Sequence, residues 1–187
     1  TPLLPSYLSD TFGADKQTIG IVLSGYTLTA LLIRALSGYM VDSFPRRTVM
    51  IASYFLFALF FAGYLVAGSL LLFAIVRTLH GAPFGATTVS NSTVAIDVLH
   101  PSRRAEGIGY YGLSNNIATA ISPSVAILLF SAYQSYDLLF WVALITALIG
   151  LASTSSVKLR EREIVKSDKP LSLDRFILLK GWRQGAA

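Results

Sequence analysis

Two arginines lie inside long apolar stretches of this chain, and they are its clearest candidates for chemistry. Arg34 and Arg77 each interrupt a run of membrane-spanning length. A guanidinium inside a bilayer costs roughly 3 kcal/mol or more unless it is paired or hydrated. Arg77 is expected ~10 Å from the outer end of its run, facing a cavity or a partner. Snorkelling to the membrane surface is the alternative for Arg77, and it explains Arg34 equally well.

Apolar runs of spanning length fill most of the chain around these arginines. Of its 187 residues 53% are hydrophobic and 13% charged, whereas a soluble domain carries about a quarter charged residues. About 20 residues in a helix cross the hydrocarbon core. We therefore predict an all-α polytopic membrane protein, with 1–8 as the end of a first span and 9–18 as a polar loop. Further spans are predicted at 19–41, 48–67, 70–94 (or as far as 99), 105–132 and 138–156.

The positive charges predict the orientation of these spans. If the spans alternate, one side receives almost every basic residue outside them, and the other side receives only Lys16. The first group is Arg46, Arg47, Arg103, Arg104, Lys158, Arg160, Arg162, Lys166, Lys169, Arg175, Lys180 and Arg183. The positive-inside rule places that side in the cytoplasm. It also accounts for the pI near 9.6 without a nucleic-acid partner. With no cysteine in the chain, disulfides and thiolate chemistry are excluded.

A ten-residue string between the second and third predicted spans carries a family resemblance. The string Gly38-Tyr39-Met40-Val41-Asp42-Ser43-Phe44-Pro45-Arg46-Arg47 resembles the loop signature of the major facilitator superfamily, Gly-x-x-x-Asp-x-x-Gly-Arg/Lys-Arg/Lys, with Pro45 where the family usually has Gly. The resemblance implies a loop that latches the cytoplasmic sides of two half-transporters together. An arginine pair that sets topology, with Asp42 as a helix cap, is the simpler explanation.

The fourth predicted span resembles a second pattern of the same family. The run Arg77-Thr78-Leu79-His80-Gly81-Ala82-Pro83-Phe84-Gly85 is similar to Arg-x-x-x-Gly-x-x-x-Gly, whose arginine is implicated in proton coupling. Gly81, Pro83 and Gly85 would thin and bend this helix. His80 is interpreted as structural rather than as a proton carrier.

The fifth span and the loop before it carry weaker resemblances. Gly109 and Pro123 are what remains of the antiporter signature Gly-x8-Gly-x3-Gly-Pro-x2-Gly, which is associated with proton-exchanging exporters. Generic packing of small residues explains the pattern almost as well. Asp97 and Arg104 match the usual connection between the fourth and fifth helices. With Arg34, they are assigned to a cytoplasmic charge cluster.

Polar residues at mid-span depth are candidates for the substrate cavity. Lipid cannot satisfy their hydrogen-bonding groups, so they must face protein or water. Interhelical hydrogen bonding is the rival explanation for each of them. The candidates are Tyr26, Asn91, Asn115, Asn116 and Thr119.

These observations predict a transport protein of the cell (inner or plasma) membrane rather than an enzyme. Residues 1–156 would be the N-terminal six-helix bundle of a twelve-helix transporter, truncated in its first helix, and 157–187 a cytoplasmic linker toward the seventh. The resemblance implies alternating access and proton-coupled export of small organic solutes, together with the C-terminal half of the same chain. An importer or uniporter of sugars or other metabolites is the alternative. No metal or cofactor is expected, and an intramembrane enzyme is disfavoured because the spans carry no evident ligand set.

Overall fold

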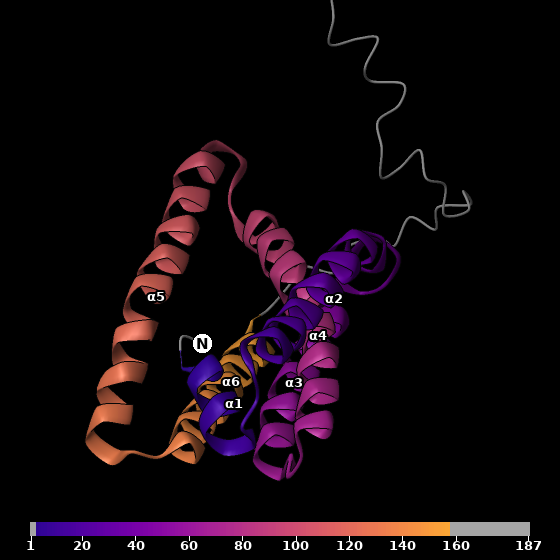
Figure 1. Ribbon diagram of the computed structural model, residues 1–187. Helices are drawn as coiled ribbons and strands as arrows, with labels where there is room; N and C mark the ends of the chain where they lie inside the picture. The colour runs from indigo at the N-terminus through magenta and orange to yellow at the C-terminus, as the bar shows by residue number, and fades with distance from the viewer. Residues whose placement is uncertain (1–2, 158–187) are drawn as a thin grey trace, which may run out of the picture.

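The computed structural model describes residues 3–157, and this part of the chain is built from helices (Figure 1). The elements are α1 (Leu4–Phe12), α2 (Lys16–Ser43), α3 (Arg46–Val66), α4 (Leu70–Val98), the short 3-10 turn η1 (Pro101–Arg103), α5 (Arg104–Tyr133) and α6 (Tyr136–Ser156). The five helices from α2 to α6 are long and apolar enough to cross a membrane. The predicted all-α polytopic fold is confirmed. The predicted linker, apart from Val157, lies outside the described residues.

Short polar residues determine where several helices begin and end. Gly13 ends α1 with a left-handed backbone at φ 64, which costs glycine little. Asp15 caps α2 by accepting a hydrogen bond from the Thr18 backbone N–H at 3.2 Å. Hydrogen bonding to the side chain of Thr18, and then to its backbone, holds the pKa of Asp15 below its ordinary value. The predicted 9–18 loop is therefore too long, because α1 continues to Phe12 and only Gly13 to Asp15 connect the two helices.

The helices α2, α3, α4 and α6 form one packed group, and α5 stands apart from it (Figure 1). None of the α5 residues is buried, whereas α4 buries more of its length than any other described span. Many large apolar side chains point outward, including Leu71, Leu128 and Ile149. A bilayer, unlike water, is a favourable solvent for such a surface.

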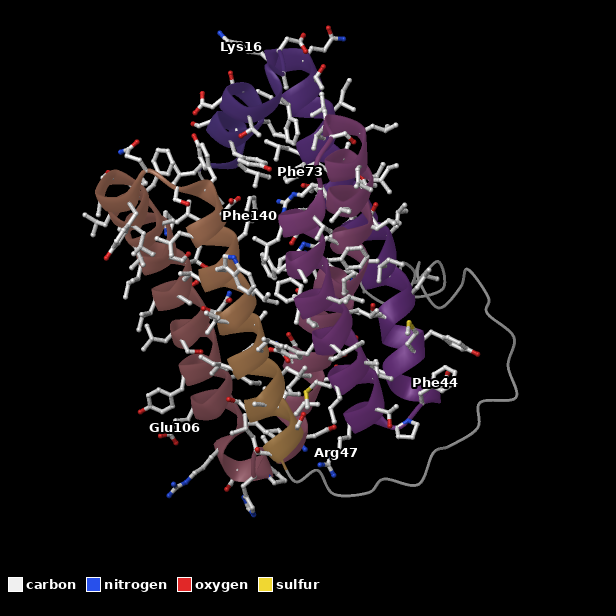
Figure 2. The ribbon with its side chains drawn as sticks, turned by 90° about the horizontal axis from the view of Figure 1, so that it is seen from below. Lys16, Phe44, Arg47, Phe73, Glu106 and Phe140 are labelled. Carbon is white, nitrogen blue, oxygen red and sulfur yellow. The ribbon has the colours of Figure 1, made fainter. Side chains whose placement is uncertain are left out.

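An aromatic cluster closes one end of the packed group. Tyr7, Tyr64, Phe73 and Phe140 contact one another with ring centroids 5.0–6.3 Å apart. In Figure 2 the labelled Phe73 and Phe140 lie in the half of the bundle that ends at Lys16. Phe44, Arg47 and Glu106 lie at the opposite end, as expected for helices that alternate in direction.

The closest approach between helices occurs where α2 crosses α4. A Cβ added at Gly85 would lie 2.5 Å from the carbonyl oxygen of Ala30, and one added at Gly81 would collide with the carbonyl oxygen of Tyr26. The two glycines therefore allow backbone-to-backbone contact between the helices. The helix α4 remains helical through Pro83, which is buried within it.

Candidate coupling and gating site

Arg77 lies on α4, two turns from the helix start, and two tyrosines hold its guanidinium. Its Cζ lies 3.8 Å from the centroid of the Tyr26 ring, and its Nη1 donates a hydrogen bond to Tyr64 Oη at 3.3 Å. A cation over an aromatic face gains roughly 0.5–2 kcal/mol, with the larger values in desolvated sites. The Arg77 Nε is buried and has no hydrogen-bond partner among residues 3–157.

No carboxylate in the described part of the chain pairs with Arg77. The acidic residues there all lie at or near helix ends: Asp10, Asp15, Asp42, Asp97, Glu106 and Asp137. The ion pair found among them joins Asp97 to Arg46, at the other end of α4. The charge of Arg77 is therefore stabilised by neutral aromatic and hydroxyl groups.

His80 follows Arg77 by one helical turn and is 1% exposed. Its Nδ1 lies 2.8 Å from Tyr64 Oη, so the same hydroxyl contacts both Arg77 and His80. The imidazole is surrounded by aromatic rings whose centroids lie 4.7–5.8 Å away, from Tyr26, Phe57, Phe60, Phe61 and Tyr64.

A small cavity of about 40 Å³ lies against Arg77. Its walls come from α1, α3, α4 and α6, and they include Tyr7, Tyr64, Tyr136 and Phe140. Arg77 is the charged residue of this lining. Since a water-sized group needs ~10–15 Å³ by this measure, the cavity has room for a small group and not for a whole organic solute.

The residues of the predicted gating loop lie where the ends of four helices meet, α2, α3, α4 and α6. Arg46, at the start of α3, pairs with Asp97 in the last turn of α4. Arg47 donates a hydrogen bond from Nη2 to the backbone oxygen of Ser155 at 2.8 Å, near the C-terminus of α6. Asp42 lies in the last turn of α2. A Cβ added at Gly38 would meet no described atom within 4 Å, so no packing contact among residues 3–157 requires a glycine there.

The other members of the predicted charge cluster lie elsewhere. Arg34 is exposed and its guanidinium lies 5.6 Å from the Phe84 ring centroid. Arg104 is the exposed first residue of α5. Within residues 3–157 neither arginine forms an ion pair with Asp97, whose partner is Arg46.

The polar mid-span candidates separate into three environments. Tyr26 lies under the Arg77 guanidinium. Asn91 donates from Nδ2 to Tyr54 Oη at 2.8 Å, which is an interhelical bond between α4 and α3. Asn115, Asn116 and Thr119 are exposed on α5, where Thr119 donates to the Asn115 carbonyl at 2.8 Å. None of these α5 residues lines the cavity beside Arg77.

The helix α5 makes no close approach at the remnant of the antiporter signature. A Cβ at Gly109 would meet no described atom within 4 Å. Pro123 lies inside α5, which remains helical through it.

Tyr64 is the site residue that the sequence analysis did not single out. The short connection between α3 and α4 makes the two helices antiparallel neighbours. A tyrosine in the last turn of α3 can therefore reach polar side chains in the early turns of α4. That combination of a short turn, a tyrosine and an arginine inside a predicted span was the available signal.

Comparisons with known proteins place the chain in a family. The model of the Major Facilitator Superfamily matches residues 1–184. Two Bacillus subtilis proteins, described as the uncharacterized MFS-type transporters YqjV and YvkA, are 27% identical over 80% of the chain and 24% identical over 94%. The staphylopine export protein of Staphylococcus aureus is 28% identical over 84% of the chain.

The chain spans 36–39% of the length of these three relatives. A family model that covers nearly every residue nevertheless agrees with the helical, membrane-spanning fold. The chain belongs to the Major Facilitator Superfamily, a family of membrane transporters and not of enzymes.

Proposed function

We propose that this chain is the N-terminal half of a proton-coupled exporter of small organic solutes that works by alternating access. The observation that carries the proposal is Arg77, a cation inside a membrane span that no carboxylate of residues 3–157 neutralises. A charge in that position is expensive, and such residues usually serve ion or substrate pathways. Proton movement elsewhere in the protein would change the field at this fixed charge, which links the proton to the conformation.

The direction of transport rests on weaker support. The staphylopine export protein is an exporter by its name, and the chain is 28% identical to it. Gly109 and Pro123 keep part of the antiporter signature in α5. An importer or uniporter is the second candidate, because the remaining glycines of that signature are replaced.

The proposal also assigns a side of the membrane and a gating role to the arginine-rich helix ends. The ends that carry Arg46, Arg47, Arg103 and Arg104 would face the cytoplasm of the cell membrane. There the Arg46–Asp97 pair and the Arg47 contact with α6 would hold the loop rigid enough to latch against the second half of the transporter.

The test is flux through the full-length protein in lipid vesicles with an imposed pH gradient. Three probes sample the charge classes: cationic ethidium, anionic carboxyfluorescein and radiolabelled glucose as a neutral solute. We expect proton-driven movement of at least one probe, abolished by a protonophore and by Arg77→Gln. The control is Arg34→Gln, because Arg34 is the other arginine within a span but is exposed. Flux that ignores the protonophore contradicts proton coupling and favours a uniporter.

A further inference from the structure

The hydroxyl of Tyr64 lies between two side chains of α4 and contacts both of them. Arg77 Nη1 lies 3.3 Å from Tyr64 Oη, and His80 Nδ1 lies 2.8 Å from the same oxygen. Arg77 and His80 are three residues apart, so they share one face of the helix. One group from the neighbouring helix α3 thus links the partly buried charge of Arg77 to the buried imidazole of His80.

Arg77, Tyr64 and His80 form a chain of hydrogen bonds. The positions of its protons follow from counting donors and acceptors. A guanidinium offers donors only, so Tyr64 Oη must accept from Arg77. The hydroxyl hydrogen is then free to point at His80 Nδ1. It finds an acceptor there only if Nδ1 is bare and the imidazole hydrogen is on Nε2. The His80 Nε2 has no described partner in either tautomer, and the opposite tautomer would in addition leave the hydroxyl hydrogen without an acceptor among the described residues.

The surroundings of His80 argue against a role as a proton carrier. Its ring is 1% exposed, and its Nε2 has no hydrogen-bond partner among residues 3–157. The Phe60 ring is stacked on it, and Phe57 and Phe61 lie 4.7 Å and 4.8 Å away by centroid distance. The titratable groups that face it are Arg77, Tyr64 and Tyr26. Within this region His80 therefore has no polar route from Nε2 to water.

We propose that Tyr64 and His80 are positioning residues for Arg77. His80, as the Nε2–H tautomer, fixes the Tyr64 hydroxyl so that an oxygen lone pair faces the guanidinium. This orientation replaces the carboxylate that would normally hold a buried arginine. The effect of this orientation on transport rests on the coupling role proposed for Arg77. The hydrogen-bond chain itself does not rest on that role.

The hydrogen-bond chain is tested by ring-nitrogen NMR of full-length protein with ¹⁵N-labelled histidine in lipid vesicles at neutral pH. The His80 signals are identified by their loss in His80→Asn. We expect a protonated Nε2 and a bare, hydrogen-bonded Nδ1, with a shift of the Nδ1 signal in Tyr64→Phe. A doubly protonated ring, an Nδ1–H tautomer or a spectrum unchanged by Tyr64→Phe would overturn the proposal, whatever the protein transports.

Flux measurements distinguish a positioning role of Tyr64 and His80 from a role in protein stability alone. Tyr64→Phe and His80→Leu should each lower gradient-driven flux on the order of tenfold and alter its pH profile, because small displacements of a reacting group are costly. His80→Asn should recover part of this loss, since its amide oxygen can occupy the place of Nδ1.

The matched control is Tyr54→Phe. Tyr54 also lies on α3 and its hydroxyl also bonds to α4, but to Asn91 at 2.8 Å and not to Arg77. We expect Tyr54→Phe to leave the pH profile unchanged. Equal effects of Tyr54→Phe and Tyr64→Phe on flux and pH profile would reduce Tyr64 to a structural residue. If Arg77→Gln itself leaves flux intact, the coupling proposal fails and the NMR result still decides the hydrogen-bond chain.

Discussion

The two arginines within the spans differ in how their charged guanidinium groups are stabilised. Arg77 is held over Tyr26 and bonded to Tyr64, while Arg34 is exposed and lies over the Phe84 ring at a longer distance. Both use aromatic faces, which suit a guanidinium better than an ammonium because it is planar and weakly hydrated. The identity of each residue as arginine therefore matters, beyond its charge.

At Arg77 we expect lysine to be a poor replacement. Arg77→Lys keeps the charge but loses the stacked, planar contact with Tyr26, which is worth roughly 0.5–2 kcal/mol. The thermal unfolding temperature of the full-length protein should fall, and it should fall less in the control Arg34→Lys. Equal losses at the two positions would argue against a special environment at Arg77.

The Arg46–Asp97 pair should contribute little to stability on its own. Both side chains are partly exposed, at 17% and 37%, and such pairs are worth roughly 0–1 kcal/mol. Asp97→Asn should lower the unfolding temperature slightly at low salt and less at high salt, where the charges are screened. An effect that does not diminish with salt would point to a purely structural role for Asp97.

Helix packing, at the scale of elements, divides the glycines into two groups. Gly81 and Gly85 lie where the backbones of α2 and α4 meet, whereas Gly38 and Gly109 have open space around them. In an open position alanine favours a helix by up to about 1 kcal/mol over glycine. At a crossing the added methyl must displace a backbone, which typically costs about 1–3 kcal/mol.

Replacement of glycine by alanine should therefore change the free energy of unfolding in opposite directions at two sites. We expect Gly81→Ala to lower the free energy of unfolding, since its Cβ would collide with the Tyr26 carbonyl oxygen. Gly109→Ala is the matched control and should be neutral or stabilising. Denaturant or thermal unfolding in detergent measures both, and a stabilising Gly81→Ala would refute the close crossing.

The Asp15 cap of α2 should make the stability of the protein depend on pH in the acidic range. The pKa of Asp15 is lowered in the folded state by its hydrogen bonds with Thr18. The contribution of Asp15 to stability is therefore fully present above its unfolded pKa, about 3.9, and is lost as the pH falls through the lower folded value. Asp15→Asn keeps a capping oxygen without a titrating group, so the variant should lack this part of the acid sensitivity, measured as unfolding temperature against pH.

The spans were predictable from the sequence because bilayer thickness imposes one length on every apolar run. Lys16, Asp15 and Gly13 show where this reasoning was less accurate: polarity alone made 9–18 a loop, whereas cap geometry makes most of it helix. That Arg77 faces a cavity or a partner was also predictable, from the cost of placing a charge inside a span. Its partner Tyr64 was not, because a tyrosine near a helix end is common and only the packing of α3 on α4 selects this one.

For the whole molecule, the absence of cysteine from this chain makes its topology directly measurable. Single-cysteine variants Lys16→Cys and Arg103→Cys should carry their thiols on opposite sides of the membrane, which a membrane-impermeant maleimide can distinguish. Lys16→Cys should be labelled from outside, and Arg103→Cys only after permeabilisation. Any native cysteines elsewhere in the full-length protein are first replaced by serine. Labelling of both positions from one side would contradict the alternating arrangement of the spans.

The position of Arg77 on α4 also has an electrical consequence. A unit charge that crosses the full membrane potential changes its energy by about 2.3 kcal/mol per 100 mV. If switching between outward and inward access moves Arg77 through about a third of that field, the balance of the two states shifts by about 0.8 kcal/mol, or roughly fourfold, per 100 mV. The transporter would then respond to voltage even when its cargo is uncharged, and Arg77→Gln should remove that response from flux measured under valinomycin-imposed potentials.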